Sequence, residues 1–320
     1  MRRSLTGTTV VIVAVAALVD ASPVDLMIGA RGYGMGGGYV AVVDDPSAAY
    51  WNPSALSRVE ELSLMESNWI LQDVEGLNIN YASLAVPIEN IGTVSGSWLA
   101  AFASLEEGSE AESNHAGEHT FSLSIGRALW DELLIFRETS VGFSINRYSF
   151  LTSEGNGSGL GFDVGLQTGF PYGLSLGFTA RTLATDVMGD KVDPELRLGV
   201  GYRRTFSEMH RLTVDVDGAW KRHRDYQDAE TFEPAGNNMK AFGGLEYALL
   251  IQDWEIAVRG GGNGMMLYNT RETYGYAAGL GVKYLGYSVQ YAFRGDTDPD
   301  ATLGYGHRVD LILQLMKLKK

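Results

Sequence analysis

Residues 211–220 read RLTVDVDGAW, and apolar and polar side chains alternate along this stretch. Successive side chains of a β-strand point to opposite faces, so the alternation puts apolar residues on one face and polar residues on the other. The apolar set is Leu212, Val214, Val216 and Trp220, and the polar set is Arg211, Thr213, Asp215 and Asp217. The pattern predicts a strand with an apolar environment on one side only.

The same period of two recurs along the chain from residue 60 onward. It predicts fourteen strands, at 60–70, 76–88, 91–104, 117–129, 138–150, 158–170, 172–184, 194–206, 209–221, 237–249, 253–263, 273–284, 285–295 and 306–316. Strands of soluble sandwiches average about 5–6 residues, whereas a tilted membrane strand needs roughly 9–11. Long strands, an even strand number and the alternation predict an all-β fold, a 14-stranded antiparallel transmembrane β-barrel.

The connections between the predicted strands alternate in length. Every second connection is long and polar, namely 105–116, 222–236, 264–272 and 296–305. Outer-membrane barrels have short periplasmic turns and longer external loops, so we expect these four to be external. At the opposite end, residues 130–137 are too many for a tight turn, and we expect a small periplasmic helix there.

Charged and polar residues occupy the strand faces that would point into the barrel. They are Asp163, Gln167, Arg197, Arg203, Asp215, Asp217, Glu255 and Arg259. Charges in such positions need either a hydrated lumen or partners of opposite charge. Glycine and serine are frequent on the same faces, which leaves room for an inserted segment.

An inserted segment, or plug, is predicted at residues 22–58, ahead of a barrel at 59–320. Residues 29–56 read GARGYGMGGGYVAVVDDPSAAYWNPSAL, a non-repeating stretch with five glycines between Gly32 and Gly38. Glycine allows positive φ and close backbone packing, as a chain inside a crowded lumen requires.

The second half of the plug carries signals for the start and for the end of a short helix. Asp44 and Asp45 are expected to cap a short helix that begins near Pro46. The Asn52–Pro53 pair is expected to end that helix and to turn the chain into the first strand.

Residues 1–21 have the form of a signal peptide. The basic pair Arg2–Arg3 precedes an apolar run at 10–19, and Ala21 provides the small side chain that a cleavage site requires. We therefore expect an exported protein whose mature chain begins at Ser22.

Composition excludes several classes of protein. The net charge of −14 argues against a nucleic-acid-binding surface, which needs clustered Lys and Arg. The chain has no cysteine, so disulfides and thiolate metal sites are excluded. No nucleophile, acid or base grouping stands out, and we expect neither an enzyme nor a bound cofactor.

The plug sequence resembles the N-terminal signature of the PorV/PorQ group, outer-membrane barrels related in fold to the FadL long-chain fatty-acid transporters. The matching residues are Gly34–Gly37 (GMGG), Val40–Val43, Asp44–Asp45, Ser47–Tyr50 and Asn52–Pro53. The match covers about a tenth of the chain, and the rest agrees only as a fourteen-strand pattern.

The resemblance implies a location in the bacterial outer membrane and two possible functions. A PorV-type protein would act in type IX secretion, with its external loops binding exported cargo or subunits of the secretion machinery. A FadL-like channel would instead hold a hydrophobic small molecule at the plug and release it sideways through the wall. The first is the main prediction and the second its alternative; membrane lipid and lipopolysaccharide are expected partners of the outer surface in both.

The candidate plug and ligand-contacting residues come from the same stretch. They are Met35, Gly36, Tyr39, Val40, Asp44, Asp45, Trp51, Asn52 and Pro53. A channel predicts an apolar pocket near Met35, Tyr39, Val40 and Trp51, whereas a purely structural plug predicts none.

Other motifs point to no chemistry of their own. The glycine run at 32–38 lacks the Lys-Ser/Thr and βαβ context of a phosphate loop. Residues 296–300 (DTDPD) lack the glycine and glutamate of an EF-hand, which leaves at most a loose calcium site. His115 and His119 have the spacing of a zinc pair in a polar loop, but a solvated loop is the default, and we expect no metal.

Overall fold

The computed structural model describes residues 26–71, 77–104, 115–133, 135–152, 155–187, 190–223, 236–267, 270–297 and 305–315. Two short α-helices, a 3-10 helix and a long series of strands follow one another. The elements are α2 (Ala30–Gly34), α3 (Ala48–Trp51), η1 (Pro53–Arg58), β1 (Leu62–Leu71), β2 (Leu77–Ile88), β3 (Gly92–Ser104), β4 (His115–Leu133), β5 (Phe136–Thr152), β6 (Gly155–Gly169), η2 (Pro171–Gly173), β7 (Leu174–Val187), β8 (Asp190–Lys191), β9 (Glu195–Phe206), β10 (His210–His223), β11 (Gly236–Ile251), β12 (Trp254–Leu267), β13 (Thr270–Tyr284), β14 (Tyr287–Asp296) and β15 (Tyr305–Leu315). The predicted signal peptide lies outside the described residues.

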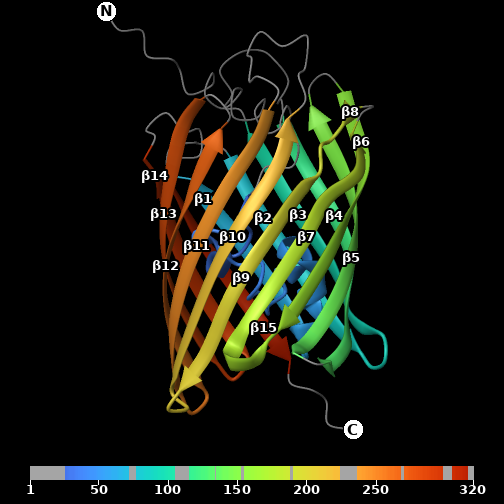
Figure 1. The fold of residues 1–320 in the computed structure, drawn as a ribbon. Coiled ribbons are helices and arrows are strands. Elements are labelled where there is room, and N and C mark those ends of the chain that lie inside the picture. The colour runs from blue at the N-terminus through green and yellow to red at the C-terminus, as the bar shows by residue number, and fades with distance from the viewer. Residues whose placement is uncertain are drawn as a thin grey trace, which may run out of the picture.

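The strands form one closed antiparallel barrel (Figure 1). Sequential strands pair with each other, and β1 pairs with β15, so the first and last strands close the ring. The two-residue β8 pairs only with the end of β7 and is not part of the wall. The remaining strands number fourteen, which confirms the predicted architecture.

The two ends of the barrel differ in their connections (Figure 1). One end carries tight turns such as 252–253 and 285–286, and the other carries the longer connections, including 105–114 and 224–235. The predicted helix at 130–137 is wrong, because β4 continues to Leu133 and β5 starts at Phe136. The loop predicted at 264–272 is shorter in the structure, because β12 continues to Leu267 and β13 starts at Thr270. In both places the local sequence lacks a strong helix or turn signal, and strand pairing decides the structure.

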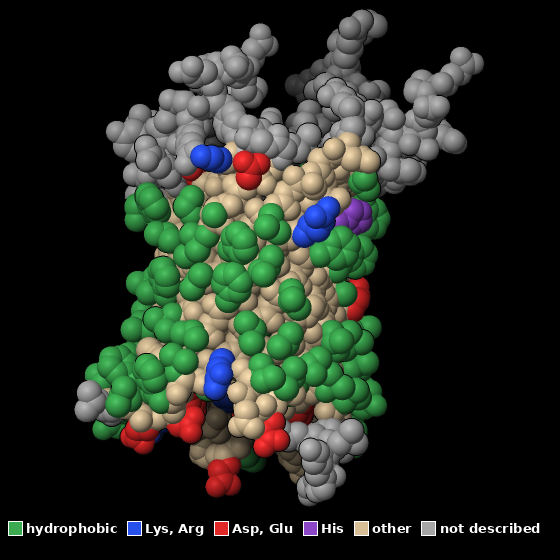
Figure 2. Space-filling model, turned by 90° about the vertical axis from the view of Figure 1, so that its right-hand side faces the viewer, with side chains coloured by type: hydrophobic (Ala, Val, Ile, Leu, Met, Phe, Trp, Pro, Cys, Tyr) green, Lys and Arg blue, Asp and Glu red, His purple; other side chains and the backbone are tan. Residues whose placement is uncertain are grey.

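The outer wall is apolar between two charged ends (Figure 2). In β14 the side chains of Tyr287, Val289 and Tyr291 are exposed, whereas Ser288 and Gln290 between them are buried in the interior. Every backbone group of a membrane-spanning segment must be paired within the protein, and a closed barrel achieves this without a free edge. Within the described residues, no helix has the length and apolarity needed to cross a membrane.

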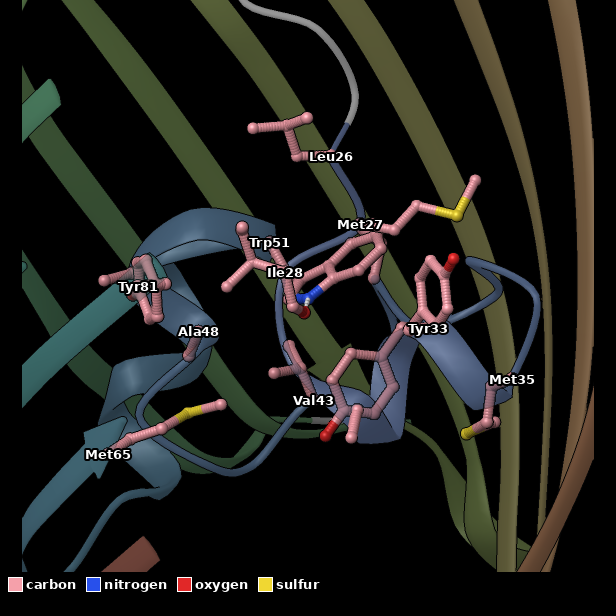
Figure 3. Packing of buried hydrophobic residues seen from close by; sticks show 14 of the residues in the cluster. Leu26, Met27, Ile28, Tyr33, Met35, Val43, Ala48, Trp51, Met65 and Tyr81 are labelled. Atoms are coloured by element: carbon pink, nitrogen blue, oxygen red, sulfur yellow. Dashed lines mark hydrogen bonds between the residues drawn. The ribbon is translucent and has the colours of Figure 1, made fainter. Parts of the chain in front are cut away.

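Residues 26–58 lie inside the barrel and form most of its core. The plug buries Ile28, Tyr39 and Trp51 almost completely, and Met65 of β1 and Tyr81 of β2 complete the apolar cluster (Figure 3). The Trp51 indole donates to the carbonyl of Ile28 at 2.7 Å, so the cluster contains no unpaired indole N–H at this position.

Candidate functional site

The plug sits against a belt of inward-facing glycines. The belt consists of Gly126, Gly142, Gly165, Gly177, Gly201, Gly244, Gly261 and Gly279, from β4 to β13. A Cβ added at each of these positions would lie only 2.2 to 3.4 Å from the nearest plug atom. The barrel can therefore enclose a polypeptide segment because its wall has no side chains where the plug backbone passes.

Charged side chains of the wall hold the plug by its backbone. The Asp217 carboxylate of β10 accepts from the N–H groups of Tyr39 and Val40 at 3.0 and 3.2 Å, and Asp215 accepts from Ala41 at 3.0 Å. Arg197 of β9 pairs with Asp217 at 3.0 Å and donates to the carbonyl of Gly37. These interactions satisfy backbone groups of residues 37–41 with side chains of the wall.

The far side of the plug is held in the same way. The Asp310 carboxylate of β15 accepts from the N–H of Ala30 at 2.5 Å, and Arg308 donates to the carbonyl of Leu26 at 2.8 Å. On β6 and β7, Gln167 and Ser175 both donate to the carbonyl of Ala41, at 2.6 and 3.0 Å. Of the inward residues predicted from the sequence, five bind the plug, namely Gln167, Arg197, Arg203, Asp215 and Asp217. The other three, Asp163, Glu255 and Arg259, bind other residues of the wall.

A buried network links the plug to the wall through Arg31. Its guanidinium makes two parallel 2.8 Å hydrogen bonds to Glu246 of β11 and a third to Asp44. Asp44 also pairs with Arg203 at 2.6 Å. Burial alone raises the pKa of Asp44, but the guanidinium groups of Arg203 and Arg31 outweigh it and hold that pKa well below its ordinary range.

The Asp44 network predicts a pH-dependent plug. A carboxyl group whose pKa is lower in the folded state stabilises that state above its unfolded pKa of about 4, and this contribution is lost as the pH falls below that value. We expect Asp44→Asn to lower the free energy of unfolding at pH 7 by about 1–3 kcal/mol. The difference from wild type should shrink below about pH 4, as measured by urea unfolding in lipid vesicles. A difference independent of pH would contradict this role of Asp44.

The predicted helix caps are partly corrected. Asp44 caps no helix, because it pairs with Arg31 and Arg203. Asp45 accepts from the N–H and Oγ of Ser47 at 2.9 and 2.5 Å, and the helix α3 then starts at Ala48. Asn52 ends α3 as predicted, and its side chain accepts from the Ser54 N–H at the start of η1.

The other candidate residues are packed tightly. Met35, Tyr39, Val40 and Trp51 have relative exposures of 0 to 1 %, and none of them lines either of the two cavities described below. Gly36 has φ +63° and touches the β12 backbone at Gly262. Asn52 donates to the carbonyl of Val40 at 3.2 Å, and Pro53 packs over Gly142.

A cavity lies on the side of the plug that faces the long connections. Its volume is about 50 Å³, and its apolar walls are Leu26, Ala49, Tyr81, Leu99 and Ala101. The N–H of Leu26 donates to the Tyr50 hydroxyl at 3.0 Å, and both residues line the cavity.

Polar groups line the opposite wall of the cavity. They are Glu118 of β4, Asn146 of β5, Asp163 of β6, and Arg181 and Thr182 of β7. Asp163 is predicted from the sequence as an inward residue, whereas Leu26, Tyr50, Glu118 and Arg181 are not predicted as site residues. Nothing in their local sequence distinguishes them from other strand or plug residues, because the barrel closure alone brings them together.

The wall beside this cavity is irregular. Residues 160–164 of β6 face residues 180–186 of β7, so β7 has seven residues where β6 has five. Thr182 and Ala184 have positive φ angles of 54° and 49°, which is costly for residues with a Cβ. Pairing between β7 and β9 ends at Arg181. The regular ladder is therefore interrupted on both sides of residues 182–185.

A second cavity lies on the other side of the plug, near the tight turns. Its volume is about 140 Å³, and its lining is polar, with Arg31, Asp44, Arg211, Glu255 and Arg259 among the residues. Each barrel strand also touches the plug, so the two cavities are separated by packed protein.

The described residues contain no group of three His, Asp or Glu side chains that could bind a metal. His119 accepts a 3.3 Å hydrogen bond from the Trp98 indole and stacks on its ring. The side chain of His115 and residues 298–300 of the proposed calcium loop lie outside the described part of the chain.

Comparison with known proteins identifies the fold. The sequence matches no model of a protein family and no curated protein. Among solved structures, a Pseudomonas aeruginosa FadL homologue superposes with a TM-score of 0.53 at 13 % identity, over 89 % of this chain and 97 % of the other.

Two hydrocarbon channels have the same fold. The CymD monoaromatic hydrocarbon channel gives a TM-score of 0.58 at 12 % identity and covers 90 % of this chain and 97 % of its own. The P. putida toluene transporter TodX gives 0.56 at 11 % identity, over 91 % and 99 %. The chain therefore has the FadL-type fold, a 14-stranded membrane barrel.

Proposed function

We propose that this protein is an outer-membrane channel for hydrophobic small molecules. A molecule enters from the end with the long connections, displaces Leu26 and Tyr50, and occupies the cavity above the plug. It then leaves sideways between β6 and β7 into the membrane. The observation that carries this proposal is the position of the cavity: the plug closes the axial route, whereas the interrupted ladder at 182–185 adjoins the cavity.

The fold comparison supports the channel over secretion. The FadL-type alternative from the sequence resemblance agrees with neighbours that are described as hydrocarbon channels. The PorV-type role in type IX secretion, the main prediction from the sequence, gains no support from the described residues or from these comparisons.

The proposal is tested by locking the irregular wall. The chain has no native cysteine, so pairs of cysteines can be introduced cleanly. Phe162 and Leu183 are partners across the irregular part of β6 and β7, and partners in an antiparallel pair lie within the distance that a disulfide spans. We expect oxidised Phe162→Cys/Leu183→Cys to lower uptake of radiolabelled toluene and decan-1-ol severalfold by cells carrying it in the outer membrane.

A matched pair in the regular part of the same ladder provides the control. Leu166 and Phe178 are partners there, on the outward face. Oxidised Leu166→Cys/Phe178→Cys should keep normal uptake, and reduction should restore uptake in the first pair. Equal uptake by the oxidised and reduced first pair would overturn the lateral route, and uptake equal to that of cells without the protein would overturn the channel.

A further inference from the structure

The cavity on the side of the long connections is lined by more acidic than basic side chains. Glu118 and Asp163 supply two carboxyl groups, and Arg181 supplies the guanidinium among the described lining residues. The Arg181 side chain already lies 3.6 Å from Glu195 and 4.4 Å from the centre of the Tyr50 ring. Glu195 and the Tyr50 ring therefore already balance the charge of Arg181, so this guanidinium would stabilise a bound ligand only weakly.

Asp163 is also satisfied within the wall. Its two oxygens accept from the Asn146 side chain at 2.7 Å and from the Thr182 N–H at 2.8 Å. Lys221, the next cation along the wall, interacts mainly with Glu195. Lys221 is not among the described residues that line the cavity.

Glu118 is different, because it has no hydrogen bond or ion pair with any described residue. It is half-buried on β4 and faces the same cavity. Residues 72–76, 105–114, 153–154 and 188–189 at this end contain no Lys or Arg in the sequence, and Lys191 of β8 is exposed opposite Asp186 of β7. These connections supply no cation for Glu118, and a cationic ligand would supply one.

We propose that the cavity selects amphiphiles whose polar end is a cationic amine and rejects carboxylates of the same chain length. The apolar walls at Leu26, Leu99 and Ala101 receive the hydrocarbon part, and Glu118 receives the ammonium group. A carboxylate would instead bring a third negative charge beside Glu118 and Asp163, in a site where charges are poorly screened. This inference rests on the proposed channel function and names the chemistry of its ligand.

The test compares three probes of equal chain length, hexylamine, hexan-1-ol and hexanoate, at neutral pH. Binding to the purified full-length protein in amphipol is measured by isothermal titration calorimetry. We expect hexylamine to bind at least about tenfold more tightly than hexanoate, a difference of about 1.4 kcal/mol, with hexanol between them. Glu118→Gln should bring the hexylamine and hexanoate affinities close together.

Glu66→Gln is the matched control, because it removes the same charge from the outward face of β1. It should leave the ratio of the two affinities unchanged. Hexanoate binding as tightly as hexylamine, or a ratio that Glu118→Gln does not alter, overturns the selectivity while leaving the channel in place. Failure of all three probes to bind overturns the proposed channel itself.

Discussion

Gly261→Ala is expected to displace the plug and strongly destabilise the barrel. The new Cβ would lie 2.2 Å from the carbonyl carbon of Met35 and 2.6 Å from the N of Gly36. These are backbone atoms, so no change of rotamer relieves the contact. Overpacking a tight core costs typically about 1–3 kcal/mol and occasionally more, and we expect the upper end of this range in urea unfolding in lipid vesicles.

The adjacent residue of the same strand gives the control. A Cβ at Gly260 would have Ala277 O, at 3.9 Å, as its nearest neighbour. Gly260→Ala should therefore change the free energy of unfolding by no more than about 0.5 kcal/mol. Limited proteolysis should cut the plug in Gly261→Ala and spare it in Gly260→Ala. Equal stability and equal protease resistance would show that the glycine belt does not seat the plug.

Asp217→Leu is expected to destabilise the barrel more than Gly261→Ala does. Asp217 is fully buried and accepts from Arg197 and from two plug N–H groups. The substitution leaves a buried guanidinium and two backbone donors without their acceptor. Removing one partner of a buried ion pair costs about 3–5 kcal/mol, and the loss of the backbone hydrogen bonds adds to this in the same unfolding measurement.

The double variant Arg197→Met/Asp217→Leu separates the charge effect from the loss of the plug contacts. Replacing both partners removes the unpaired charge, so the double variant should be more stable than Asp217→Leu alone. It should remain less stable than wild type, because Tyr39 and Val40 still lose their acceptor. Additive effects of the two substitutions would show that Arg197 and Asp217 are not coupled.

The sequence alone determined the number of strands and the face that each residue occupies. Period two is a local property of the chain, and shifting a strand by one residue would move its apolar side chains from the lipid to the lumen. For the same reason Asp215, Asp217, Arg197 and Gln167 could be placed inside from the sequence. Asn52 likewise ends its helix through local chemistry, with Pro53 next in the chain.

Only the tertiary structure decided what these inward residues touch. Asp217 meets Tyr39 across 178 positions of sequence, and Asp310 meets Ala30 across 280. Such contacts depend on barrel closure between β1 and β15 and on the height at which the plug settles, and no local pattern encodes either. For this reason the pocket was predicted near Met35 and Trp51, where the plug packs tightly against the glycines of the wall. The free space lies instead beside Leu26, where residues of β2 to β7 line the cavity and Glu118 has no partner among the described residues.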